Sequence, residues 1–350
     1  MVMKNFNVFV VLLALLLFEV GARVLITAKS KTPIFKTQEL IYTCYDELKD
    51  INGLSIIKDN RYFDLLILSA SIFDTDYDWG KQIVEDLSRR LGKELNKTVR
   101  IHNLSRKAMS SRDSKIKAGY ALDKDFDLIL WYHGINDVRA NNCPDQLYKD
   151  DYSHYLWYDK VNAFQRFKRI NKFLISPYCV NLAWITIQEK FKLKEYVSEY
   201  WKPNHLWIDH GDKIKTGQSF QDNLLFVIKK AKERNIPMMV MTFAYYVPDD
   251  YSLEKYYKRE LDWAKHDWPI EVIGKHDNVR KGMEIHNKVI EDVAIGTGQD
   301  MLMFLDMNNI IEKNKDNFRD VCHFTENGAR VFVDNIVNRI VKEPHFKNNR

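Results

Sequence analysis

The stretch "FDLILWYHGINDVRANN", residues 126–142, changes at Gly134 from a nearly continuous apolar run to Gly-Ile-Asn-Asp. A short apolar run without polar alternation is typical of a strand that is covered on both faces of a parallel sheet. Gly, Asn and Asp are turn formers, so the residues that follow are, taken alone, most simply the loop that leaves this strand. The rest of the chain indicates that this loop does more.

Four other apolar runs share this character and alternate with amphipathic helices, which is the pattern of an α/β protein. Helix faces are predicted near residues 79–91 and 224–231, and a final helix from about Glu326 to Val341. The sequence therefore predicts a three-layer α/β/α domain with a five-stranded parallel sheet. The predicted strands are "DLLILS" (64–69), "TVRIHN" (98–103), "DLILWYH" (127–133), "IPMMVMTF" (236–243) and "MLMFLD" (301–306).

The chain has 350 residues, 45% of them hydrophobic, and a formal net charge of +5. This composition supports a full hydrophobic core and excludes a disordered or fibrous chain. Positive and negative charges are interspersed, without the concentrated basic stripe of a nucleic-acid-binding protein. No nucleic-acid partner is therefore expected, and the composition does not indicate an oligomeric state.

The N-terminus carries a membrane-targeting segment, because residues 8–18, "VFVVLLALLLF", are uninterrupted apolar sequence behind Lys4. This core is short enough for a signal peptide, and small residues at 20–22 could serve cleavage. Residues 6–26 together are instead long enough for a membrane-spanning helix.

We favour a retained signal-anchor within residues 1–30, in which Glu19 and Arg23, four residues apart, pair near one membrane interface. The alternative of a cleaved signal stays open. In either case the chain is expected to be membrane-anchored or exported, with its soluble domain in the cell envelope outside the cytoplasm.

The four cysteines form no C-x-x-C pair and have no histidine at zinc-site spacing, so no metal site is expected. Cys143 and Cys179 could form a disulfide across the segment between them, which the sequence does not establish. The cysteines are Cys44, Cys143, Cys179 and Cys322.

Polar side chains follow the predicted strands, at the edge of a parallel sheet where ligands bind. Ser71 lies in "SASIFD" after the first strand, "NLSRKAMSS" (103–111) follows the second, and "HGIND" (133–137) follows the third. Asp320 precedes His323 by three residues, just ahead of the last helix. A serine, an asparagine and an Asp-His pair are therefore expected at one edge of the sheet.

This ordered set resembles the SGNH (GDSL) hydrolase superfamily of serine esterases, lipases and acylhydrolases, in the form of a membrane-anchored bacterial-type member. "SASIFD" matches the block that holds the nucleophilic serine, "GIND" matches the Gly-x-Asn-Asp block without change, and "DVCHFTENG" matches the Asp-x-x-His block and its continuation. The resemblance implies an SGNH, flavodoxin-like hydrolase domain over residues 60–345. A long insertion at about 140–218 interrupts it.

Several positions depart from the family pattern. Ser69 replaces the usual glycine of the first block, and Ala70 replaces the Asp of the name motif. The second block normally supplies a glycine, where alignment puts Ala108; alanine keeps the N–H but reaches positive φ only at a cost. Ser105 is the alternative for the nearby position.

The resemblance implies a catalytic triad in which Ser71 is the nucleophile, His323 the general base and Asp320 the group that orients the imidazole. It also implies an oxyanion hole formed by the N–H groups of Ser71 and Ala108 and the side-chain amide of Asn136. This mechanism requires no metal and no other cofactor.

Two residues of the Gly-x-Asn-Asp block are expected to support this site. Gly134 would let the backbone turn tightly, so that Asn136 points into the pocket. Asp137 is expected to support the loop without taking part in the chemistry.

The insertion is rich in aromatic residues and is predicted to be mostly helical. Such residues can stack on sugars or shelter an acyl chain, and they can equally form the core of a small helical cap. We favour the cap, with some aromatic side chains facing the substrate. The aromatic residues are Tyr152, Tyr155, Trp157, Tyr158, Trp184, Tyr196, Tyr200, Trp201 and Trp207.

The expected activity is hydrolysis of an ester, an acyl or acetyl group on a small molecule, an envelope glycan or a lipid. An O-acyltransferase that uses the same residues is the second hypothesis, because a sugar hydroxyl can resolve an acyl-enzyme in place of water. A non-catalytic glycan-binding protein on the same fold is the third, since Ser69 and Ala108 stand where glycines are usual.

Overall fold

The computed structural model describes residues 2–30, 37–170, 174–196, 207–298 and 302–347. The chain divides into two compact units. The first, here called the anchor unit, comprises Met1–Lys49 and Asp151–Tyr200. The second, here called the sheet unit, comprises Asp50–Asp150 and Trp201–Arg350.

The sheet unit is built on a five-stranded sheet in which every strand pair is parallel, with the order β2-β1-β3-β4-β5. The predicted α/β/α fold class is therefore confirmed. The third and fourth strands are shorter than predicted, because the pairing between them ends at Trp131 and Val240. The strands are β1 (Tyr62–Leu68), β2 (Thr98–Asn103), β3 (Leu128–Trp131), β4 (Met238–Met241) and β5 (Leu302–Leu305).

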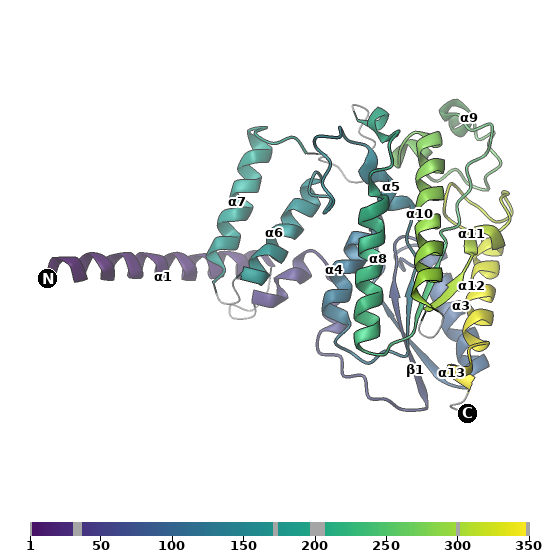
Figure 1. Ribbon diagram of the computed structural model, residues 1–350, viewed down its shortest axis with the longest axis horizontal. Helices are drawn as coiled ribbons and strands as arrows, with labels where there is room; N and C mark the ends of the chain where they lie inside the picture. Colours follow the sequence, from purple (N-terminus) through teal and green to yellow (C-terminus); the bar gives the residue numbers. More distant parts are fainter. Residues whose placement is uncertain (1, 31–36, 171–173, 197–206, 299–301, 348–350) are drawn as a thin grey trace. The chain divides into compact units, whose positions relative to one another are not determined.

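Helices cover both faces of the sheet (Figure 1). On one face α3 (Asp78–Leu95) packs against α12 (Glu326–Val341), and on the other α8 (Thr216–Glu233) packs between α4 (Ser111–Ala121) and α10 (His276–Thr297). Each crossover thus returns to a parallel strand through a helix. Shorter elements connect these: α2 (Leu48–Ile51), α5 (Ile135–Val138), η2 (Arg139–Asn141), η3 (Ile208–Gly211), α9 (Leu253–Lys258), η4 (Ile270–Val272), α11 (Met307–Ile310) and α13 (Pro344–Lys347).

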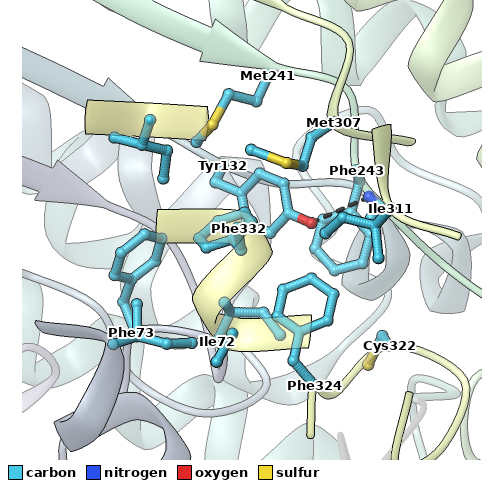
Figure 2. Close-up of a cluster of buried hydrophobic side chains, with 14 of the residues drawn as sticks. Ile72, Phe73, Tyr132, Met241, Phe243, Met307, Ile311, Cys322, Phe324 and Phe332 are labelled. Atoms are coloured by element: carbon cyan, nitrogen blue, oxygen red, sulfur yellow. Dashed lines mark hydrogen bonds between the residues drawn. The ribbon is translucent and has the colours of Figure 1, made fainter. Parts of the chain in front are cut away.

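The buried Tyr132 contacts the segment after β4 and helix α12, as Figure 2 shows. The ring of Tyr132, directly after β3, stacks on Phe243 at 4.6 Å between centroids and lies 5.1 Å from Phe332 of α12. Its hydroxyl oxygen accepts the backbone N–H of Ala244 at 2.9 Å. A buried phenol needs such a partner. The loops after β3 and β4 and one face of α12 are therefore held in a fixed arrangement.

The anchor unit is helical. It contains α1 (Val2–Ser30), η1 (Thr37–Thr43), α6 (Leu156–Ile170) and α7 (Ser176–Lys190). Within α1, the segment Val8–Ala28 is long and apolar enough to cross a membrane, a test that a signal sequence near an N-terminus also passes. Its apolar side chains are mostly exposed, with 11% of that segment buried.

Three tyrosines of the predicted aromatic insertion form part of the anchor unit's own core. Tyr152, Tyr155 and Tyr158 are buried, and the ring of Tyr158 lies 5.7 Å from that of Tyr152 and 6.3 Å from that of Tyr155. These side chains are structural. Tyr200 and Trp201, from the same insertion, lie outside the described residues.

All four cysteines carry free thiols. The disulfide considered between Cys143 and Cys179 is not formed. The two residues belong to different units, and the Sγ of the buried Cys143 instead contacts the carbonyl oxygen of Ala140 at 3.8 Å.

Candidate active site

Ser71 lies in the turn that follows β1, where its side chain is partly exposed. The nearby Ser69 is buried, and its Oγ donates to the carbonyl oxygen of Tyr132 at 2.8 Å. The two serines of "SASIFD" therefore differ in what they can do. Ser69 fixes the strand end, whereas Ser71 is partly exposed and its hydroxyl is within reach of a neighbouring side chain.

The segment ahead of α12 brings Asp320 and His323 together. One carboxylate oxygen of Asp320 accepts the backbone N–H groups of Cys322 at 3.0 Å and His323 at 2.9 Å, which closes a tight local turn. Thr325 then caps α12 by accepting the N–H of Gly328 at 3.1 Å. The sequence thus turns sharply between the acid and the helix, and this turn directs the imidazole toward its own carboxylate.

The three side chains predicted as a triad form a continuous chain of contacts. The Nδ1 of His323 lies 2.7 Å from the Oδ2 of Asp320, and the Nε2 of His323 lies 2.9 Å from the Oγ of Ser71. Asp320 and the imidazole are buried. If Nδ1–H donates to the carboxylate, Nε2 is left as the acceptor for the serine proton.

Burial and charge act in opposite directions on this pair. Burial disfavours the imidazolium, but the charge and hydrogen bond of Asp320 outweigh it and hold the pKa of His323 well above its usual value. Burial disfavours the charged form of Asp320. The positive charge of His323, and the hydrogen bonds that the carboxylate accepts from backbone N–H groups, nevertheless lower the pKa of Asp320. The site is therefore arranged to favour an imidazolium beside a carboxylate.

The predicted oxyanion donors lie on three loops. Ala108 has φ of 60°, in the left-handed region that favours glycine, so an alanine adopts a strained conformation at this position. Within the described part of the chain, the backbone N–H groups of Ser71 and Ala108 donate to no protein acceptor. Ser105, the alternative for the second block, is fully buried.

Asn136 is held beside the loop of Ala108. Its Nδ2 donates to the carbonyl oxygen of Met109 at 2.9 Å, and its Oδ1 accepts from Arg139 at 3.3 Å. These two contacts fix which end of the amide is the donor. One amide hydrogen is used by Met109, which leaves the second for another acceptor.

Two side chains connect the turn after β1 to the loop after β2. The carboxylate of Asp74 accepts the N–H of Lys107 at 2.7 Å, and the amide of Asn103 donates to the carbonyl oxygen of Phe73 at 2.6 Å. The backbone that leads to Ala108 is therefore fixed relative to the turn of Ser71. The sequence did not predict this contact of Asn103, because the residue is simply the last one of the predicted strand 98–103.

Gly134 stands in the turn that the sequence predicted, since its carbonyl oxygen accepts the N–H of Asp137 at 3.2 Å, and close packing adds a second reason for a glycine. Its φ of 175° lies outside the left-handed region that favours glycine. A Cβ at this position would instead lie 2.7 Å from the Cβ of Phe243 and 2.7 Å from the Cε of Met283. The glycine is needed because the residue after β4 and a side chain of α10 approach the backbone closely.

Asp137 binds the start of α4 through Ser111. Its two carboxylate oxygens accept the N–H of Ser111 at 2.9 Å and the hydroxyl of Ser111 at 2.6 Å. It is fully buried. These contacts hold the first turn of α4.

Trp79 is a site neighbour that the sequence did not reveal, because its spacing matched the buried face of the first helix. Its indole N–H donates to the carbonyl oxygen of Ser71 at 3.1 Å, and its ring lies 4.9 Å from that of His323. The guanidinium of Arg319 lies over the same indole at 4.9 Å. Trp79 therefore touches both ends of the Ser-His pair.

Cys322 is the other neighbour that sequence reasoning missed. Its Sγ lies 3.8 Å from the Nδ1 of His323, and the ligand atoms of Asp320, Cys322 and His323 lie within 4.8 Å of one another. A soft metal would need the thiolate, but burial raises the pKa of Cys322. Asp320 and His323 are already engaged with each other, so these residues fit a metal poorly.

No protein-family model and no curated protein sequence matches this chain. Solved structures that are similar in fold include a GDSL-like lipase from Bacteroides thetaiotaomicron, at 13% identity over 85% of this chain and 97% of that one, with a TM-score of 0.43. Others are an acetylxylan esterase from Geobacillus stearothermophilus (13% identity, 81% and 95% covered, TM-score 0.42) and a lipase/acylhydrolase from Enterococcus faecalis (12% identity, 80% and 95% covered, TM-score 0.42).

Proposed function

We propose that this chain is a serine hydrolase that cleaves an ester through a Ser-His-Asp triad and an acyl-enzyme intermediate. The observation that carries the proposal is the chain of contacts from Asp320 through His323 to the partly exposed hydroxyl of Ser71. A serine hydroxyl is a weak nucleophile until a neighbouring base accepts its proton. The geometry supports this role for His323, because its imidazole lies within hydrogen-bond distance of the serine hydroxyl and of a carboxylate that could orient it.

In the proposed reaction, the Nε2 of His323 accepts the proton as the Oγ of Ser71 forms a bond to the acyl carbon. The bond from that carbon to the alcohol oxygen then breaks, and the imidazolium gives its proton to the leaving alcohol. A water molecule attacks the acyl-enzyme in the same way, which releases the carboxylic acid and restores the serine. The raised pKa of His323 supports this role, because Asp320 stabilises the imidazolium formed in each step.

Negative charge develops on the acyl oxygen when Ser71 attacks, and we assign its stabilisation to the N–H groups of Ser71 and Ala108 and the amide of Asn136. Donors already oriented toward such a charge contribute about 3–4 kcal/mol each. The two backbone N–H groups, which have no acceptor within the described part of the chain, and the second amide hydrogen of Asn136 support this assignment. Asp74 and Asn103 act as positioning residues for the loop of Ala108.

We assign the substrate to acyl or acetyl esters on an envelope glycan or a lipid. The apolar α1 supports this choice, because a chain held at a membrane meets lipids and envelope glycans there. Transfer of the acyl group to a sugar hydroxyl would use the same site and the same first half-reaction. Glycan binding without turnover is the non-catalytic alternative.

The test is ester hydrolysis by the full chain in lipid nanodiscs, with p-nitrophenyl acetate and longer acyl esters. Ser71→Ala should lower kcat by at least about 10³-fold. Ser69→Ala is the matched control: it lies two residues away, loses one buried hydrogen bond and should keep near wild-type turnover. Equal turnover by wild type and Ser71→Ala would contradict the proposal.

Product analysis separates the alternatives. Free carboxylic acid in the presence of a glycan acceptor supports hydrolysis, and acylated glycan indicates an acyltransferase. Folded protein that binds the glycan without any turnover would favour the non-catalytic alternative.

A further inference from the structure

Helix α7 of the anchor unit is apolar on two opposite sides. Tyr178 and Ile185 face the interior of the unit and are buried. On the other side, four apolar side chains repeat at helical spacing and form one exposed stripe. This stripe consists of Val180 (55% exposed), Trp184 (52%), Ile187 (41%) and Phe191 (65%), the last directly after α7. Water-exposed helices rarely carry such a continuous stripe, which marks an interaction surface.

A polar cluster fixes α7 to α1. The carboxylate of Glu19 accepts the backbone N–H groups of Ile175 and Ser176, each at 2.9 Å, and Arg23 donates to the same carboxylate at 2.7 Å. Glu19 thereby occupies the N-terminus of α7, where unpaired N–H groups attract a negative charge. Removal of residues up to Ala22 as a signal peptide would leave α7 without this cap, which favours a retained α1.

The part of α1 before Glu19 is exposed and apolar. From Val8 to Phe18 its apolar side chains are largely uncovered. Residues 2–18 of this helix span about 26 Å at about 1.5 Å per residue, close to the thickness of a bilayer's hydrocarbon core, about 30 Å. The Glu19 cluster therefore lies near the place where α1 would leave the membrane.

The stripe faces the same side as this free part of α1. Figure 1 shows α7 running across α1, with α6 on the side away from the N-terminus of α1. Tyr178 packs against Phe164 and Phe167 of α6, with ring centroids 5.5 and 5.7 Å apart. Because the stripe is opposite Tyr178, it points toward the side from which the N-terminal part of α1 projects.

We propose that the stripe of α7 lies flat on the bilayer that α1 crosses, with Trp184 and Phe191 inserted at the interface. A membrane surface suits this stripe, because amphipathic indole and phenyl rings are favoured there. Lys190 and Lys192 flank Phe191 and are exposed, so they would contact anionic lipid headgroups. This contact is independent of the activity proposed above.

The test uses the quenching of tryptophan fluorescence by brominated lipids in the full chain, inserted in nanodiscs. Bromine on the acyl chains quenches an indole at the interface but not one in water. Trp184→Phe should abolish most of the quenching, because it removes the tryptophan of the stripe. Trp268→Phe is the matched control, since Trp268 is similarly exposed (46%) but lies in the sheet unit, and its loss should leave the quenching in place.

A charge variant tests the lipid class. Quenching should deepen when phosphatidylglycerol replaces phosphatidylcholine in wild type, and this gain should vanish in Lys190→Gln/Lys192→Gln. If Trp184→Phe and Trp268→Phe change the quenching equally, the stripe does not contact lipid and the proposal is wrong. Two chains per disc, with Trp184 unquenched, would overturn it in favour of an interface between copies.

Discussion

The Nε2 of His323 lies 2.9 Å from the Oγ of Ser71, although 252 residues separate the two along the chain. The fold makes this contact possible by placing the turn after β1 and the segment before α12 at the same edge of the sheet. Asp320 lies on the far side of the imidazole, at 2.7 Å. The imidazole therefore lies between the carboxylate and the serine hydroxyl.

Asp320→Asn should change both the rate and its pH dependence. His323 must be neutral to accept a proton, so kcat/KM should rise as the pH rises through the pKa of His323. Asp320 holds this pKa above its usual value, and losing that charge should move the rising limb to lower pH. The plateau should fall about 10⁴-fold, because the imidazole is no longer held in its working tautomer.

The measurement for this change is a pH profile of ester hydrolysis. Asp316→Asn, on the same segment but exposed, is the control and should keep the wild-type profile. If kcat/KM of Asp320→Asn rises over the same pH range as in wild type, Asp320 does not raise the pKa of His323.

Asn136→Ala should lower kcat by about 10²–10³-fold with little change in KM, because an oxyanion donor acts mainly in the transition state. Steady-state kinetics of wild type and variant on the same ester measure the split. Asn136→Asp is the companion variant, since it keeps the shape of the side chain and loses its donor. If both variants lower the free energy of unfolding but leave kcat unchanged, Asn136 only supports the loop through Met109.

Gly134→Ala should destabilise the protein by about 1–3 kcal/mol, because the new Cβ has no room beside Phe243 and Met283. Chemical denaturation of the full chain in detergent measures the loss. Gly119→Ala is the control: a Cβ added there would meet no atom within 4 Å, and alanine favours the helix, so the free energy of unfolding should rise by about 0.5–1 kcal/mol. Equal effects of the two substitutions would refute the close-approach explanation.

The periodicity of the sequence was enough to predict the parallel sheet and its last helix, which runs from Glu326 to Val341. Strands with such continuous apolar runs must be buried on both faces of the sheet. Only a few folds cover both faces of a parallel sheet with helices. Strand ends were less predictable, because pairing with the neighbouring strand decides where β3 ends, and this partner lies about 100 residues further along the chain.

The position of the candidate site could be predicted from the polar residues that follow the strands in the sequence. The contacts that support the site could not be predicted in this way. Trp79 has the spacing of a core residue, and only the folded chain brings its N–H to the carbonyl oxygen of Ser71. Gly134 was predicted from its turn, and only the folded chain shows that Phe243, from the segment after β4, also approaches it closely. Contacts between distant segments leave no local pattern in the sequence.

Covalent labelling measures whether the hydroxyl of Ser71 is an activated nucleophile. The full chain in nanodiscs is treated with a fluorophosphonate probe, and the modified residue is identified by peptide mapping. We expect a label on Ser71 that disappears in His323→Ala. Folded protein that takes up no label, or a label on Ser69 instead, would contradict this expectation.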